Sequence, residues 1–332
     1  MPLILIGVGM IWWRGPNWST VSDAFTVVRW PWVIAAVGFN LLSVVVRAVA
    51  WNTAIRQALP EPHPRFRLVF SAFCVGLFGN VVLPGRVGEL ARVAVLNRRM
   101  AGRRGSWATL IGSVLAHRIF DLFPAIALVV WVLLFAKLPP WAFTSLEVVL
   151  GVGVALFAFA VIGARRHSHT RPIDELGTIR ALIVRARFGL GVMRAPVPAA
   201  TAATFQFSGW VFQLFAVDAA MHAFRIYQPL VAAGLVLVLM NVATIFPLWP
   251  GNIGLVQAAI AYPLTQYGVD YGRGFAFGIG LQAIEASVGV GVGFLFLARE
   301  GLSYATLKQM PSSDPEAPRN PVSDDASASL PG

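Results

Sequence analysis

Long apolar stretches recur along the whole chain and constrain its fold more than any other feature. Of its 332 residues, 57% are hydrophobic and 12% are charged, and the mean hydropathy is +0.70. Runs of about 18 or more mostly apolar residues follow one another, each long enough to cross roughly 30 Å of hydrocarbon as a helix. The sequence therefore predicts an all-α polytopic membrane protein and excludes a soluble enzyme.

The chain divides into one membrane domain and a tail. Residues 1–308 form the predicted transmembrane domain, and residues 309–332, rich in Pro, Ser and Asp, are expected to be a disordered cytoplasmic tail. Residues 14–29 are typical of a short interfacial helix. The apolar segments lie at about 3–13, 30–55, 66–83, 86–97, 106–135, 143–164, 199–222, 229–248, 252–267 and 274–299.

Two short stretches 166 positions apart are versions of one another. Leu83 to Leu90 reads LPGRVGEL, Trp249 to Val256 reads WPGNIGLV, and each Pro-Gly pair interrupts an apolar run. Unwound backbone at membrane depth is tolerated only where it lines a cavity, so matching breaks in two halves point to the central site of a transporter. We therefore expect a first repeat at about 30–135 and a second at about 199–299.

The arginines predict the topology. They make up 24 of the 26 basic residues and crowd into 56–104 and 165–194, and short positive loops stay in the cytoplasm. With both regions inside, we predict that 66–97 and 229–267 are two oppositely oriented re-entrant hairpins beside six full spans. The alternative is that each arm is a full span and each Pro-Gly an ordinary kink. The net charge of +11 is then a topology signal, and no nucleic acid partner is expected.

The first break is polar for its depth, because Arg86, Glu89 and Arg92 follow it on one helix face. Charges at mid-membrane cost roughly 2.5–3.5 kcal/mol, so they pair or face water. The helix start offers free N–H groups, which with Arg86 make phosphate a reasonable ligand. The alternative is a structural ion-pair ladder, or snorkelling of Arg92 to the interface, and for Arg92 we favour this structural interpretation. The predicted binding residues at the two breaks are Asn80, Pro84, Gly85, Arg86, Gly88, Glu89, Pro250, Gly251, Asn252 and Gly254.

Further ionisable residues lie inside predicted spans. Arg118 and Asp121 are three positions apart, so they can share one interior face, either in the binding site or as a salt bridge that fixes helix packing. His117 lies on the same face as a candidate proton or ion-pair group. Glu285, in the middle of the last span, either meets a cation such as Arg118 or carries a proton. Arg47 is a further candidate, and Asp218 is expected to pair with His222 near the outer interface.

Other patterns predict packing or surface contact. Residues 165–197 form a basic amphipathic linker suited to an anionic cytoplasmic leaflet. Gly289 and Gly293 form a small-residue face typical of helix contact. The single Cys74 excludes a disulfide framework, and the sequence contains no phosphate-cradling loop, zinc helix or nucleophile elbow, so no cofactor is expected.

Together these residues resemble a known family. Asn80-x3-Pro84-Gly85-Arg86-x-Gly88-Glu89-x2-Arg92, Arg118-x2-Asp121 and Pro247-x2-Pro250-Gly251-x2-Gly254 are similar to the signature regions of the lysylphosphatidylglycerol synthase transmembrane-region family, also called the flippase-like membrane domain, over about residues 3–300. The resemblance implies a role in moving or handling lipids. In that family a Glu is usual at the position of His117, a Gly at that of Asn252 and commonly a Glu at that of Gln257.

We expect a multi-pass lipid translocase of the bacterial inner membrane that holds a headgroup phosphate between the two hairpin tips. The 33 residues after Arg299 leave no room for a fused aminoacyltransferase domain, so we expect no synthesis of lysylphosphatidylglycerol and no enzyme activity. One alternative is a non-transporting scaffold for a lipid or glycan enzyme. The other is an intramembrane transferase that uses His117 and Asp121.

Overall fold

The computed structural model describes residues 16–59, 61–82, 87–100, 106–165, 192, 195–244 and 252–299. Every regular element within these residues is helical, which confirms the all-α prediction for this part of the chain. The predictions for 3–13, for the greater part of the linker 165–197, for the tail 309–332 and for Pro84, Gly85, Arg86, Pro250 and Gly251 lie outside the described residues. The helices are α2 (Trp18–Thr26), α3 (Trp30–Ala58), α4 (Phe66–Val82), α5 (Gly88–Arg99), α6 (Ser106–Phe135), α7 (Pro140–Arg165), α9 (Pro196–Ala223), α10 (Leu230–Ala243), α11 (Leu255–Leu264), the 3-10 turn η5 (Thr265–Tyr267) and α12 (Tyr271–Arg299).

Four of these helices, α3, α6, α7 and α12, contain a segment that is long and apolar enough to cross a membrane. Helix α9 has 28 residues but is not among the four, although a span was predicted at 199–222. Its sequence contains Gln206, Gln213 and Asp218, which lower its hydropathy. The described residues thus contain four such helices, against the six full spans predicted for the chain.

Helices α3 and α9 form a central antiparallel pair. Trp32 lies against His222 near one end, with ring centroids 4.7 Å apart, and Arg29 N–H donates to the carbonyl of Ala223. Halfway along, Ser43 Oγ donates to the carbonyl of Gly209 over 2.8 Å. Gly209 has no side chain, so it leaves room for the stem of the Arg47 side chain, and an added Cβ would lie 2.7 Å from Arg47 Cγ.

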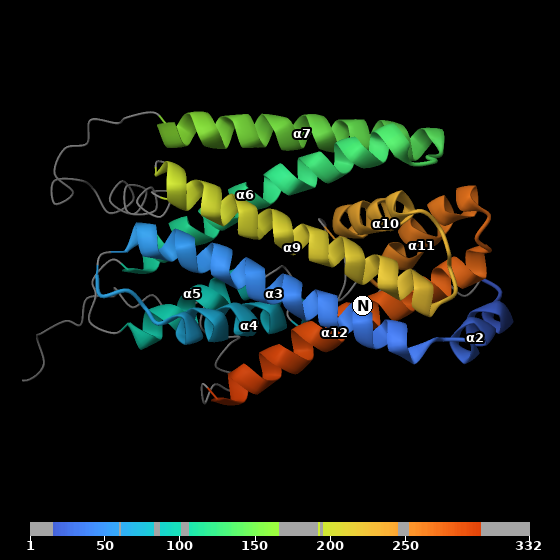
Figure 1. Cartoon of the computed structure of the whole chain (residues 1–332), viewed down its shortest axis with the longest axis horizontal. Helices are drawn as coiled ribbons and strands as arrows, with labels where there is room; N and C mark the ends of the chain where they lie inside the picture. Colours follow the sequence, from blue (N-terminus) through green and yellow to red (C-terminus); the bar gives the residue numbers. More distant parts are fainter. Residues whose placement is uncertain are drawn as a thin grey trace, which may run out of the picture.

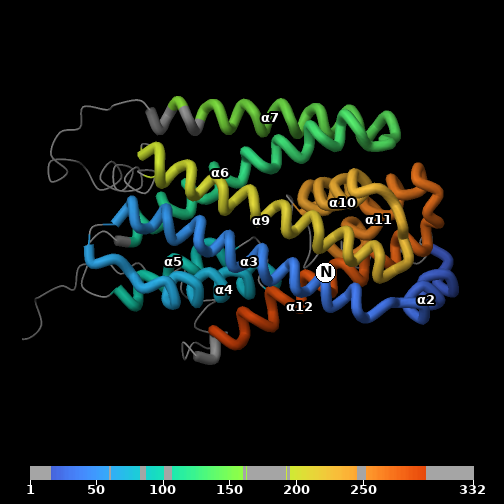
Figure 2. Tube along the Cα trace, in the orientation of Figure 1, coloured from blue at the N-terminus to red at the C-terminus, as the bar shows by residue number. Residues whose placement is uncertain are grey.

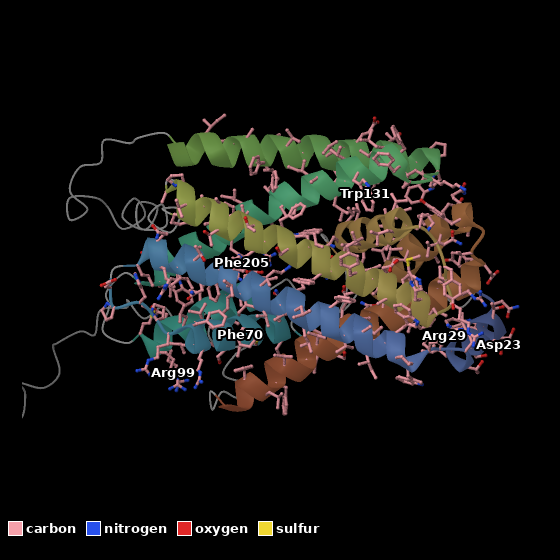
Figure 3. The ribbon with its side chains drawn as sticks, in the orientation of Figure 1. Asp23, Arg29, Phe70, Arg99, Trp131 and Phe205 are labelled. Atoms are coloured by element: carbon pink, nitrogen blue, oxygen red, sulfur yellow. The ribbon has the colours of Figure 1, made fainter. Side chains whose placement is uncertain are left out.

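Two short helix pairs enter this bundle from opposite ends (Figure 1). Helices α4 and α5 contact each other at the end where α3 finishes and α6 begins, whereas α10 and α11 contact each other at the other end. The tube in Figure 2 shows that each pair turns back toward the end from which it came. In Figure 3, Arg99 at the end of α5 lies at one end of the bundle, opposite Asp23 and Arg29.

Both pairs pack against α12. Gly289 and Gly293 face Val81 and Phe78 of α4, as expected for a small-residue packing face, while Gly278 faces Gln257 of α11. Contact with α4 is thus made by the second half of α12 and contact with α11 by its first half. One large apolar cluster surrounds α10 and α11 and another surrounds α4 and α5.

The helix order repeats with nearly constant spacing. Helices α3, α4, α5 and α6 are followed by α9, α10, α11 and α12, with α7 between the two sets. The starting residues are separated by 166 positions (Trp30 and Pro196), 164 (Phe66 and Leu230), 167 (Gly88 and Leu255) and 165 (Ser106 and Tyr271). This is the arrangement expected of two repeats, and the opposite entry of the two helix pairs is what an inverted repeat requires.

Candidate functional site

A polar layer crosses the bundle where the long helices reach their midpoints. Glu285 has 14 residues of α12 on either side, so it lies about 21 Å from each helix end. Arg118 and Asp121 lie within three residues of the middle of α6, and Arg47 lies three residues past the middle of α3. Ionisable groups at this depth are costly unless they are paired, and they commonly mark a substrate or ion pathway.

Glu89 connects the first helix pair to this layer. It stands in the first turn of α5, and its carboxylate forms ion pairs with Arg92 of the same helix and with Arg118 of α6. Asn80 Nδ2, near the end of α4, donates to Glu89 Oε1 over 3.5 Å. The predicted residues Asn80, Glu89 and Arg118 are therefore brought together.

Arg92 is a buried structural group. The residue is 3% exposed, so the suggestion that it snorkels to the interface is wrong. Its guanidinium carbon lies 4.7 Å from the ring centroid of Trp51 and 5.6 Å from that of Phe73. Stacking on aromatic faces and pairing with Glu89 both offset the cost of burying the cation.

Asp121 collects donors from three helices. Arg118 Nη1 lies 3.1 Å from Asp121 Oδ2 and Arg47 Nη1 lies 3.7 Å from Oδ1, so Arg118 and Asp121 share a face, as predicted, and form the salt bridge that was one of the two interpretations. The Gln206 amide and Trp210 Nε1 of α9 also donate to Oδ1, the latter over 3.0 Å. Neither residue was among the site residues predicted from the sequence. Both carboxylate oxygens of Asp121 therefore have donors.

Glu285 does not meet Arg118. Gln213 Nε2 of α9 donates to Glu285 Oε1 over 3.1 Å, and Gln213 Oε1 accepts from Arg47 Nη2 over 3.0 Å. Within the described residues, no Lys, Arg or His nitrogen forms an ion pair with Glu285. Of the two alternatives for Glu285, contact with Arg118 is therefore not the one found in the described residues, and the amide of Gln213 stands between Glu285 and Arg47.

Arg118 is the most exposed arginine of the cluster. Its side chain is 43% exposed, against 17% for Arg47 and 4% for Arg92. Leu115, three positions earlier on α6, is also exposed, as are Phe123 of α6 and Phe207 of α9, whose rings contact each other. Arg118 thus presents a partly exposed guanidinium near the middle of α6, a helix that also exposes apolar side chains.

His117 and Gly88 contribute through packing. The His117 ring is 3% exposed and meets the ring of Phe73 edge-on, with centroids 5.9 Å apart. Gly88 lies so close to α4 that an added Cβ would stand 1.9 Å from the carbonyl oxygen of Gly76. We therefore assign Gly88 to the contact between α4 and α5 rather than to ligand binding.

Hydrogen bonds from side-chain amides stabilise the residues that follow the second Pro-Gly pair. Asn252 has a positive φ of 44° and Gly254 one of 94°, conformations that Asn and Gly adopt most readily. This explains why Asn can stand where the similar family usually has Gly. Asn252 Nδ2 donates to the carbonyl of Ala243 over 2.8 Å, closing the loop between α10 and α11.

Gln257 holds the start of α11 against α12. Its Oε1 accepts from Gly254 N–H over 2.5 Å, and its Nε2 donates to Gln282 Oε1 over 2.6 Å. Gln282 lies three residues before Glu285, so the second break reaches the middle of α12 as the first reaches the middle of α6. Asn252 and Gly254 thus hydrogen-bond to the backbone of Ala243 and to the side chain of Gln257.

Asp218 and His222 pair away from the cluster, as predicted. Asp218 Oδ2 lies 3.6 Å from His222 Nδ1 in the last turns of α9.

Comparison with known proteins places the chain in a family. The family described as Lysylphosphatidylglycerol synthase TM region matches residues 3–293, in agreement with the resemblance of the motifs. A UPF0104 membrane protein of Pyrococcus horikoshii is 30% identical over 139 residues, which make up 40% of each chain, so the match spans less than half of that relative. No solved structure matches. The chain is thus a membrane protein and belongs to the lysylphosphatidylglycerol synthase transmembrane-region family.

Proposed function

We propose that this protein is a lipid translocase of a bacterial inner membrane and that it carries a lipid with a phosphate-bearing headgroup. The observation that supports this most is the exposed guanidinium of Arg118 at the middle of an apolar 30-residue helix. A cation at that depth is unfavourable unless an anion covers it. Glu89 and Asp121 serve this purpose in the protein without lipid, and a lipid phosphate, which approaches from the bilayer itself, can take their place.

Binding follows from exchange of ion pairs. Without lipid, Arg118 is shared between Glu89 and Asp121. A phosphate accepts two parallel hydrogen bonds from a guanidinium, so it can replace one or both carboxylates at Arg118. The acyl chains stay in the bilayer beside Leu115, Phe123 and Phe207. The role is transport, and no chemical reaction is assigned to the cluster.

We further propose that α4 with α5, and α10 with α11, are re-entrant hairpins whose rocking exposes the site to each leaflet in turn. The helices have 17, 12, 14 and 10 residues, which correspond to about 26, 18, 21 and 15 Å. All four are shorter than the roughly 30 Å of hydrocarbon that a full span crosses.

Spin labels test the depth of the hairpin tips. In a Cys74→Ala background, labels at Val87 and Ile253 should both report mid-bilayer depth by oxygen accessibility. Labels at Arg98 and Asp270 should report opposite surfaces, because the two pairs enter from opposite ends. If the Val87 label lies at the same surface as the Asp270 label, α4 and α5 are full spans.

Lipid movement in reconstituted vesicles tests the translocase itself. Arg118→Ala and Glu89→Gln should reduce the rate at which fluorescent anionic phospholipid crosses the membrane by about tenfold or more, because each removes one side of the exchanging ion pair. Arg99→Ala, which removes an exposed arginine at the bundle end, is the matched control and should keep the wild-type rate. A wild-type protein without lipid movement would instead favour the scaffold function.

A further inference from the structure

Two residues at matching positions of the repeats bond to each other across the centre of the bundle. Arg47 and Gln213 are 166 positions apart, the spacing between the two Pro-Gly breaks, and Arg47 Nη2 donates to Gln213 Oε1 over 3.0 Å. Ser43 and Gly209, also 166 apart, bond one helical turn away. The axis that relates the two repeats therefore passes close to these pairs.

Arg47 and Gln213, the axial pair, each contact a carboxyl group of their own repeat. Arg47 of α3 lies 3.7 Å from Asp121 of α6, and Gln213 of α9 lies 3.1 Å from Glu285 of α12. The result is a chain of four side chains in the order Asp121, Arg47, Gln213, Glu285. It connects α6 and α12, the last helices of the two repeats, by way of α3 and α9 and through one arginine.

The carboxyl groups at the two ends of this row of four side chains differ in the number of cations that pair with them. Asp121 has two arginine partners and two neutral donors, whereas Glu285 accepts from an amide. Arg47 is the charged group that faces Glu285 from α3. From α9 the facing group is the neutral Gln213, and α4 and α11 contain no charged residue except Arg67 in the first turn of α4. One arginine thus pairs directly with Asp121 and is connected to Glu285 through Gln213.

We propose that Glu285 carries a proton that is exchanged against Arg47 and crosses the membrane together with the lipid. While Arg47 pairs with Asp121, Glu285 holds the proton. When Arg47 swings past Gln213 to Glu285, the proton leaves. This inference rests on the proposed lipid transport, since it identifies what drives that transport.

The exchange is balanced in protons and charge. On the donor side, a hydronium ion transfers its proton to the Glu285 carboxylate and becomes water. On the other side the same O–H bond breaks, and a water molecule takes the proton. A bound phosphate occupies Arg118 and leaves Asp121 to Arg47, which keeps Glu285 protonated while the anionic lipid moves. A lipid with one negative charge then crosses as an electrically neutral pair with its proton, which avoids work against the membrane potential.

A pH gradient across lipid vesicles tests the coupling. With fluorescent phosphatidylglycerol as the probe, acidifying the compartment from which the lipid departs should raise the wild-type rate several-fold. Glu285→Gln should not respond to the gradient, since it cannot release a proton. The matched control is Glu147→Gln, which removes an exposed carboxyl group of α7 and should respond as wild type does.

Infrared spectroscopy tests the exchange without transport. The purified protein should show the stretch of a protonated carboxyl group that Glu285→Gln lacks and that the wild type loses in alkaline buffer. Arg47→Gln, which makes position 47 match position 213, should retain this band in buffer where the wild type has lost it. Equal titration of the two proteins, or no band assigned to Glu285, would overturn the proposal.

The outcomes separate the two proposals. If no lipid moves under any gradient, the translocase proposal fails, and the infrared result alone decides whether Glu285 exchanges its proton with Arg47. If lipid moves but the gradient changes nothing in wild type, the translocase proposal stands and proton coupling is wrong.

Discussion

Gly88→Ala should lower the thermal stability of the purified protein more than any other single-methyl addition in the described helices. The new Cβ would stand 1.9 Å from the Gly76 carbonyl oxygen and 2.6 Å from the backbone nitrogen of Asn80. Both are backbone atoms, so no side-chain rotation relieves the clash. Helix α5 must move away from α4, and Glu89, one residue later, then moves relative to Arg118.

The expected loss exceeds the roughly 1–3 kcal/mol typical of overpacking, because the contact cannot relax by repacking side chains. It is measured as the shift in unfolding midpoint in detergent. The control is Gly38→Ala in α3, where an added Cβ meets nothing within 4 Å. That change should be neutral or slightly stabilising, since alanine favours a helix by about 0.5–1 kcal/mol over glycine. Equal midpoints for Gly88→Ala and Gly38→Ala would refute the close packing of α4 and α5.

Asp121→Ala should be the most destabilising change within the polar layer. It leaves Arg47 and Arg118 without one carboxylate partner, and it removes the acceptor of the Gln206 amide and of Trp210 Nε1. Removing one partner of a buried ion pair typically costs about 3–5 kcal/mol, because the remaining charge stays buried. Unfolding of the purified protein in denaturing detergent mixtures measures this loss.

A double variant separates this cause from loss of packing. In the Arg47→Met background, Asp121→Ala should cost less than in wild type, because one of the stranded cations is gone. Glu147→Ala, on the exposed face of α7, serves as the control and should change stability by about 0.5 kcal/mol or less. Additive losses in the double variant would show that Arg47 and Asp121 do not interact.

The spacing of residues along each helix was enough to predict several of the contacts in the site. Arg118 and Asp121 were expected on one face because they are three apart, and Glu89 was expected to pair with an arginine. Helical periodicity places a residue on a face of its own helix, but it does not say which other helix that face meets. The pairing of Glu89 with Arg118 therefore came only from the structure.

The neutral members of the layer were missed for a different reason. Gln206, Gln213 and Trp210 are ordinary residues in an apolar helix, and a composition search for charges passes over them. A signal was available for one of them, because adding the 166-residue spacing of the Pro-Gly breaks to Arg47 gives Gln213. Comparing the halves position by position would have identified the axial pair.

Helix ends were predicted less well than helix faces. The apolar stretch at 229–248 was expected to be helical throughout, yet α10 ends at Ala243. The stretch at 252–267 yields the ten residues of α11 and the three-residue 3-10 turn η5. Hydropathy reports which residues prefer lipid and not where the backbone leaves the helix. The positive φ of Asn252 and Gly254 marks such a point, and it depends on hydrogen bonds to Ala243 and Gln257 that are not visible in the sequence.

The repeats share their helix order but not their charges, and this inequality has a consequence for the resting protein. At the positions of Glu89, Arg92 and Arg118, the second repeat carries Leu255, Ala258 and Ile284. Two halves with identical side chains would give the inward-facing and outward-facing arrangements the same free energy. Under the proposed transport cycle, moving the half with the Glu89 cluster costs a different free energy from moving the other half, so the lipid-free protein should favour one of the two arrangements.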